Sequence, residues 1–263
     1  MPRYAVKLYY DGKNFNGFQS QKDRRTAAAE ILSALKRSGL ISDSNEAKFQ
    51  AASRTDKGAS ALSQTIAFTT DQRFSTSRLN AFLPHDIKAW SWAYAPNAFN
   101  PQRDALERNY VYTHPYSGEN LELMLEASKI LLGSHDFRNF VKRTNGPCIK
   151  TLTKLAIKKN KDILAFSFSS KSFARGMIRK IMTVILEIGR GKTSVGYLKK
   201  LLNPAFKPLG GVYPAKAENL ALFNIKYKLK FNVDKRSQSE LIEKLKDEVT
   251  SAEIKRLCVN KLT

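Results

Sequence analysis

The order in which strand-like and helix-like segments follow one another most constrains the fold of this 263-residue chain. Residues 4–10 alternate in polarity and end at Asp11-Gly12, which predicts a strand and a turn. Residues 26–39 have the apolar spacing of an amphipathic helix. The segments that follow predict strands at 48–52, 64–70 and 87–94 and a short helix at 76–83. The first hundred residues therefore form one α+β unit.

The second half repeats this order. Its predicted elements are a strand at 109–114, a helix at 119–133, a hairpin of 151–157 and 163–169, a long helix at 172–192 and a strand at 220–231. An apolar stripe at four-residue spacing along the long helix is expected in the core, namely Phe173, Met177, Ile181 and Ile185. A charged amphipathic helix is expected at 237–262.

Two units of the same order predict an α+β fold with two related ferredoxin-like lobes. Each lobe would be an antiparallel sheet with helices, and the two sheets would join across a central cleft. We expect an N-terminal lobe over 1–104, a C-terminal lobe over 105–231 and a helical tail over 232–263.

The charge of the chain indicates a polyanionic partner. Lys and Arg number 45 against 23 Asp and Glu, a net charge of +22. Residues 137–180 hold twelve of the basic side chains and one acid, Asp162, so half of the excess lies in this stretch. A basic surface of this kind binds nucleic acid through counterion release, and an anionic membrane face is the alternative.

Other residue types exclude several classes of protein. No apolar run is long enough to span a bilayer, and the first residues do not have the pattern of a signal peptide. Cys148 and Cys258 are single and far apart, which fits a reducing cytoplasm and gives no zinc spacing. Because the three histidines are also scattered, we expect no metal site.

The stretch "AASRTDKGAS" at 51–60 is the first candidate for chemistry. It places Asp56 two residues after Arg54 and two before Gly58. A nearby cation favours the charged form of a carboxyl group, which suits a nucleophile. An Asp-Lys-Gly turn explains the same residues, and composition and spacing alone favour the turn.

Several segments, in order, resemble the tRNA pseudouridine synthase A family. "SRTDKGASAL" at 53–62 resembles its Arg-Thr-Asp signature, and "FNPQRDALERNYVYTH" at 99–114 resembles its second motif. "GSHDFRNF" at 133–140, "FARGMIRKIMTVILEIGRGK" at 173–192 and "PAKAENLAL" at 214–222 resemble the later motifs. The resemblance spans residues 3 to about 228.

The resemblance implies a pseudouridine synthase fold and a cytoplasmic tRNA-modifying isomerase. The family converts uridine to pseudouridine in the anticodon stem-loop, at about nucleotides 38 to 40, without a cofactor or metal. It is typically a homodimer in which both subunits contact one tRNA. Asp56 would be the nucleophile, attacking C6 of the base or C1′ of the ribose.

The resemblance also assigns the residues around the nucleophile. Arg54 would support the extruded nucleotide, and Arg179 would pair with Asp56. Tyr110 would stack on the target base and help to take the proton from C5, while Leu220 or Leu222 would form an apolar wall. The segment at 99–103 would touch RNA through Phe99 and Arg103, and the basic segment 137–180 would grip the tRNA body.

Departures from the family pattern bear on specificity. Ala59-Ser60-Ala61 stands where the family often has Val-His-Ala, and Asn219 replaces a closing glycine. These departures concern which uridines are modified.

Three rival functions are a non-catalytic RNA-binding protein on the same scaffold, a membrane-surface protein and a metal-dependent nuclease.

Overall fold

The computed structural model describes residues 1–142 and 146–262, without the side chains of 254–262. Arg143 and the Cys258 side chain therefore lie outside the described residues. The strands are β1 (Arg3–Tyr10), β2 (Gln50–Ala51), β3 (Ser60–Thr69), β4 (Ile87–Ala95), β5 (Glu107–Pro115), β6 (Gly133–Asp136), β7 (Ile149–Asn160), β8 (Ile163–Ser170), β9 (Leu220–Lys226) and β10 (Asn232–Val233). The helices are α1 (Ala27–Arg37), α2 (Thr76–Asn80), α3 (Leu121–Leu131), α4 (Met177–Gly189), α5 (Val195–Leu202) and α6 (Lys235–Leu262), with 3-10 turns at Gly12–Asn14 and Arg138–Phe140.

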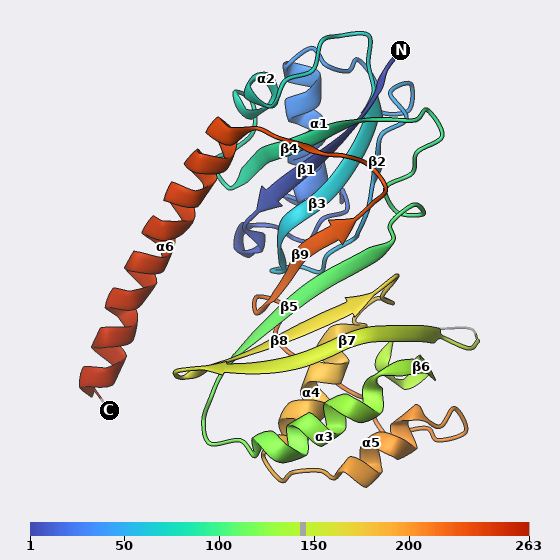
Figure 1. Ribbon diagram of the computed structural model, residues 1–263, viewed down its shortest axis with the longest axis vertical. Coiled ribbons are helices and arrows are strands. Elements are labelled where there is room, and N and C mark those ends of the chain that lie inside the picture. Colours follow the sequence, from blue (N-terminus) through green and yellow to red (C-terminus); the bar gives the residue numbers. More distant parts are fainter. Residues whose placement is uncertain (143–145, 263) are drawn as a thin grey trace.

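The ten strands of the described chain form one sheet, which confirms the α+β prediction. The strand order is β10-β4-β1-β3-β9-β5-β8-β7-β6, and β2 pairs with β3. Every pair is antiparallel except β3 with β9, where Ser60 lies opposite Ala221 and Ala61 opposite Leu222. The strand β9 thus joins the strands of the first half to β5 of the second, so the sheet continues through the whole molecule (Figure 1). The chain divisions at 104/105 and 231/232 stay a prediction.

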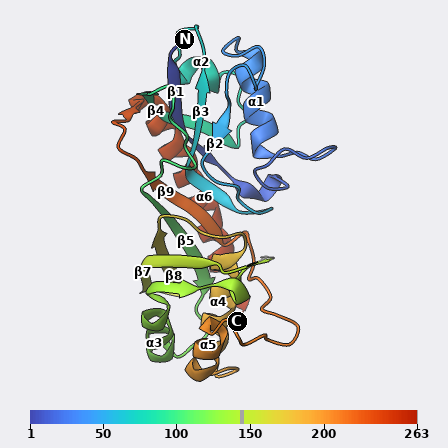
Figure 2. The same cartoon turned by 90° about the vertical axis from the view of Figure 1, so that its right-hand side faces the viewer.

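Helices cover the sheet where apolar residues face them. In the first half α1 lies over β1 and β3, and in the second half α3 and α4 lie against β7 and β8, with α5 packed on α3 (Figures 1 and 2). The alternate residues Val6 and Leu8 of β1 and the helix residues Ile31 and Leu35 are all buried in one large cluster. Because this cluster also includes residues of α3, α4 and β8, a shared core holds the two halves together.

The helix predicted at 172–192 begins later than the spacing indicated. It starts at Met177, because Gly176 adopts a left-handed conformation with φ of 76° and interrupts the backbone before it. Met177, Ile181 and Ile185 are buried as expected. Phe173 was wrongly placed on this helical stripe, since it lies in the preceding loop with its ring 5.2 Å from that of Tyr110.

The strand predicted at 220–231 ends at Lys226. The following residues cross the other face of the sheet, where Tyr227 packs with Phe99 over the small side chains of Ala5 and Ala67. Sequence periodicity did not indicate α5 or β6, which are short.

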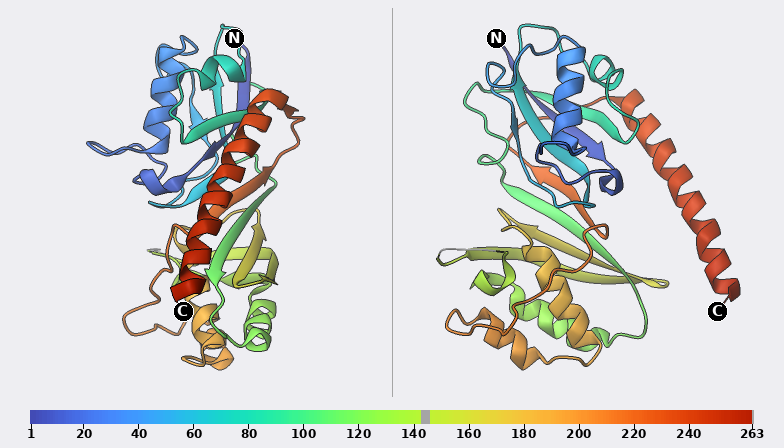
Figure 3. Two further views of the ribbon diagram at one scale, coloured as in Figure 1. Left: turned by 90° about the vertical axis from the view of Figure 1, so that its left-hand side faces the viewer. Right: turned by 180° about the vertical axis from the view of Figure 1, so that it is seen from behind.

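The tail forms α6 as predicted, and its first turns attach to β4 through Leu241 and an ion pair between Lys88 and Glu240. The remainder of α6 stands away from the body (Figure 3).

The turn at Asp11-Gly12 packs tightly on the residues that follow Asp56. A Cβ on Gly12 would lie 2.2 Å from the carbonyl oxygen of Ala59 and 2.6 Å from that of Gly58. We therefore expect Gly12→Ala to destabilise the protein by about 1–3 kcal/mol or more through overpacking. Chemical denaturation measures this loss.

Gly196→Ala is the matched control. It lies on α5, and its nearest neighbour would be 3.5 Å from the new Cβ, an ordinary contact. We expect this variant to be as stable as the wild type or to gain up to about 1 kcal/mol, because alanine favours a helix more than glycine does. Equal stability of the two alanine variants would contradict the tight packing at Gly12.

Candidate active site

A pocket of about 880 Å³ opens between the two halves of the molecule. The first half contributes the loops at 16–24 and 52–57, and the second half contributes the segment 172–179. Tyr110 of β5 and Leu220 of β9 complete the lining. The strands that join the two halves of the sheet therefore also carry part of the pocket wall.

Asp56 and Arg179 meet in this pocket. One Nη atom of Arg179, in the first turn of α4, lies 2.7 Å from a carboxylate oxygen of Asp56, and each side chain is 20% exposed. The Arg179 Nε donates to the carbonyl oxygen of Ala215 at 2.6 Å. Arg175, which is 75% exposed, lies 4.0 Å from the other oxygen of Asp56. The carboxylate is therefore directed by a fixed guanidinium and still reaches solvent.

Buried side chains from both halves hold the backbone beside Asp56. Thr55 shares a hydrogen bond of 2.7 Å with the hydroxyl of Tyr10 on β1, and Ser53 shares one of 2.7 Å with the hydroxyl of Tyr110. The Gln64 amide donates to the carbonyl of Ser53 at 2.7 Å. These contacts fix residues 53 and 55, whereas Arg54 between them is exposed and lines the pocket.

Arg108 connects three segments around the pocket. Its buried guanidinium donates to the carbonyl oxygens of Ala52 at 3.1 Å, Gln102 at 2.7 Å and Lys171. The three acceptors belong to the segments before Asp56, after Phe99 and before α4. A single buried cation therefore ties the Asp56 loop to the other two walls. No motif around Arg108 separately indicated this role.

Tyr110 presents a buried ring to the pocket. It is 7% exposed, and Phe173 packs edge-on against it. Burial raises the pKa of Tyr110, and the hydrogen bond shared with Ser53 opposes this shift only in part. The neutral phenol is therefore favoured near neutral pH, so it serves most readily as a hydrogen-bond donor or as a link in a proton path.

The other predicted site residues are divided between the pocket and its surroundings. Leu220 lines the pocket, whereas Leu222 is fully buried in the core. Phe99 lies outside the pocket lining, in the small cluster on the opposite sheet face. Arg103 is exposed and bonds to Asp104 and to the carbonyl of Ala98. The neighbouring Gln102 is the residue of this segment that lines the pocket.

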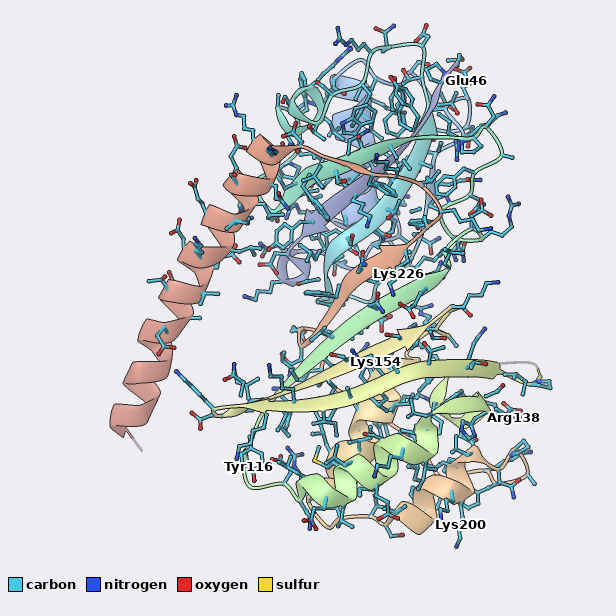
Figure 4. All side chains as sticks on the ribbon, in the orientation of Figure 1. Glu46, Tyr116, Arg138, Lys154, Lys200 and Lys226 are labelled. Atoms are coloured by element: carbon cyan, nitrogen blue, oxygen red, sulfur yellow. The ribbon has the colours of Figure 1, made fainter. Side chains whose placement is uncertain are left out.

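The basic segment at 137–180 does not form a single surface. Arg175 and Arg179 line the pocket. On β7, Leu155 is buried toward the helices, so the adjacent Lys154 points to the opposite sheet face. That face also carries Lys226 of β9, which pairs with Glu107 at 2.7 Å (Figure 4). Only part of the predicted basic surface therefore borders the pocket.

Sequence reasoning missed three contributors to the site, namely Arg108, Arg175 and Phe173. Gly176 was the one local signal that Phe173 and Arg175 lie in a loop, because a glycine before an amphipathic run can begin a helix and leave the earlier residues outside it.

Within the described residues, no group of three or more His, Cys, Asp or Glu side chains is arranged to hold a metal ion. No described helix is both long and apolar enough to cross a membrane.

Comparison with known proteins identifies the class. The family described as tRNA pseudouridine synthase matches residues 127–228. A tRNA pseudouridine synthase A of Archaeoglobus fulgidus is 34% identical over 95% of this chain and 93% of its own length. A tRNA pseudouridine synthase A of Methanosphaera stadtmanae is 35% identical over 94% of this chain and 93% of its own.

The sheet, the cleft and these matches define a pseudouridine synthase, an isomerase class. Within that class, the chain belongs to the tRNA pseudouridine synthase A family. Among solved structures, the archaeal box H/ACA sRNP Nop10-Cbf5 complex is 13% identical with a TM-score of 0.34, covering 70% of this chain and 44% of that one. This likeness is too distant to bear on the site.

Proposed function

We propose that this protein isomerises uridine to pseudouridine in the anticodon stem-loop of tRNA, at about nucleotides 38 to 40, with Asp56 as the nucleophile. The observation that carries the proposal is the contact between Asp56 and Arg179 in a pocket that Tyr110 also lines. Family membership supports tRNA as the substrate, and the proposed position follows the family resemblance. We also propose a cytoplasmic homodimer.

The chemistry requires few groups because uridine and pseudouridine are isomers. A carboxylate oxygen of Asp56 attacks C6 of the base or C1′ of the ribose, and the bond between N1 and C1′ breaks. The uracil turns, C5 bonds to C1′, and the bond that Asp56 formed breaks, which returns the free carboxylate. The C5 proton leaves, and N1 ends protonated. The atoms of substrate and product balance, so no oxidant, reductant or second substrate is consumed.

Each neighbouring residue has a proposed part in this sequence. Arg179 directs the carboxylate, because its Nε is already held by the carbonyl of Ala215. Tyr110 and Leu220 form the walls that keep the detached uracil. Arg54 is exposed at the pocket and would fill the space that the extruded nucleotide leaves in the stem. Arg103 is exposed and is proposed to support the RNA from outside the pocket, whereas the buried Phe99 is proposed to act only by positioning this segment.

Mapping of pseudouridine at single-nucleotide resolution tests the proposal. An unmodified tRNA transcript is treated with the protein, then with a carbodiimide that marks pseudouridine, and is read by primer extension. We expect new stops at positions within 38 to 40, with a chelator present throughout. Modification elsewhere in the tRNA would contradict the proposed position. A bound transcript without any new stop would instead support a non-catalytic RNA-binding protein.

A further inference from the structure

A loop between α5 and β9, residues 203–216, projects from the second half of the molecule. It extends on the same side as the loop at 16–25 of the first half, which lines the pocket (Figures 2 and 3). The two loops come from different halves and flank the side on which the pocket residues lie. The 203–216 loop is therefore positioned to meet a large substrate that enters the pocket.

The 203–216 loop is fixed at both ends. At its start, the Asn139 amide donates to the carbonyl oxygens of Leu201 and Phe206, both at 2.9 Å. At its end, Ala215 accepts from Nε of Arg179 at 2.6 Å. The same Arg179 also contacts Asp56, so this one side chain links the end of the loop to the proposed nucleophile.

The tip of the loop is exposed in a defined conformation. Gly211 donates to the carbonyl of Pro208 at 3.0 Å, and Gly210 and Gly211 have φ values of 71° and 70°. This left-handed turn, which glycine adopts readily, leaves the Leu209 side chain fully exposed. Val212, the first residue after the two glycines, is buried. The exposure of Leu209 therefore belongs to an ordered turn.

Tyr213 is held by its backbone and presents its ring to solvent. Its carbonyl oxygen accepts from the Thr183 hydroxyl at 2.7 Å, and its side chain is 76% exposed. Thr183 follows Arg179 by four residues, so Tyr213 is anchored one helical turn along α4 from the partner of Asp56. Within the described residues its ring packs on no other aromatic ring or cation. The ring is therefore available to a ligand.

The charge of the loop indicates which ligand it would take. Residues 203–217 contain no acid, and Lys207 and Lys216 are exposed. Arg175 adds an exposed cation beside the pocket. A partner that is anionic and also offers flat apolar faces fits this combination, and an RNA with unstacked bases has both properties.

We infer that the 203–216 loop is a second contact surface for the RNA substrate, on which Tyr213 stacks against an unpaired base of the anticodon loop. The lysines of the same loop neutralise nearby phosphates. The inference rests on the proposed function, because it takes the target nucleotide to lie in the pocket. Its consequence is that Tyr213 contributes to RNA affinity and has no part in the chemical step.

The test compares Tyr213→Ala and Tyr213→Phe with the wild type on an anticodon stem-loop RNA. We expect Tyr213→Ala to raise the Kd by about 10- to 100-fold, because stacking on one base has this effect, while the rate at saturating RNA stays unchanged. Tyr213→Phe keeps the ring and should bind as the wild type does. Tyr94→Ala is the control, since Tyr94 is another exposed tyrosine on β4 and should leave the Kd unchanged.

A second set of RNAs identifies the base. Stem-loops with an abasic nucleotide at one loop position at a time are bound to the wild type and to Tyr213→Ala. At the stacked position the difference in Kd between the two proteins should disappear. Equal affinity of both proteins for the intact stem-loop, or a difference that persists on every abasic RNA, would overturn the inference. A wild type that binds through Tyr213 without isomerising any uridine would overturn the proposed function alone.

Discussion

Asp56→Asn is expected to abolish pseudouridine formation while leaving tRNA binding nearly unchanged. The amide has the shape of the carboxylate and can still accept from Arg179, but it is a poor nucleophile. Loss of a nucleophile lowers the rate by about 10⁴-fold or more in enzymes whose groups act together. Single-turnover formation of pseudouridine measures the rate, and filter binding of the same tRNA measures the affinity.

Asp71→Asn is the control for this variant, because it makes the same chemical change at an exposed acid outside the pocket. It should react and bind as the wild type does. Retention of more than a trace of activity in Asp56→Asn would exclude Asp56 as the nucleophile. A large loss of affinity would mean that the carboxylate acts mainly in holding the RNA.

Arg179→Met should have the second largest effect. The methionine removes both the contact with Asp56 and the hydrogen bond to the carbonyl of Ala215, so the carboxylate is no longer held in one orientation. We expect the rate at saturating tRNA to fall by about 10²- to 10³-fold, as when one preorganised charged contact is removed. Arg179→Lys should be intermediate, because a lysine is a point charge that cannot make both contacts at once.

Lys180→Met separates this effect from a general loss of basic charge. Lys180 follows Arg179 on α4, but it donates to the carbonyl of Val141 at 2.7 Å and does not line the pocket. The rate of Lys180→Met at saturating tRNA should match that of the wild type. Thermal unfolding of all three variants shows whether the helix is retained. A wild-type rate in Arg179→Met would contradict the orienting role.

The order of elements was largely predictable because amphipathic periodicity is a local property. The strand at β1, the helix at α1 and the hairpin of β7 and β8 all appear close to their expected positions. The late start of α4 was not predictable from periodicity, since Phe173 continues the apolar spacing. It depends on the left-handed backbone at Gly176, which the four-residue pattern does not reveal.

The arrangement of the site depended on contacts between distant parts of the chain. Asp56 and Arg179 are 123 residues apart, and only the family resemblance linked them before the structure brought them together. Arg108 could not be recognised because its partners are backbone carbonyls, which every residue has. Phe99 became buried because the chain after β9 crosses the sheet and packs Tyr227 on it, a course set by tertiary structure.

Release of the hydrogen on C5 of the target uridine is the most direct measure of Asp56 as the nucleophile. A tRNA transcript labelled with tritium at C5 of uracil is incubated with the wild type and with Asp56→Asn in the presence of EDTA. Tritium released to water and pseudouridine formed in the same tRNA are then counted. We expect equal amounts of the two from the wild type and neither from Asp56→Asn. Tight tRNA binding by the wild type without tritium release would contradict the isomerase reaction and the role of Asp56 in it.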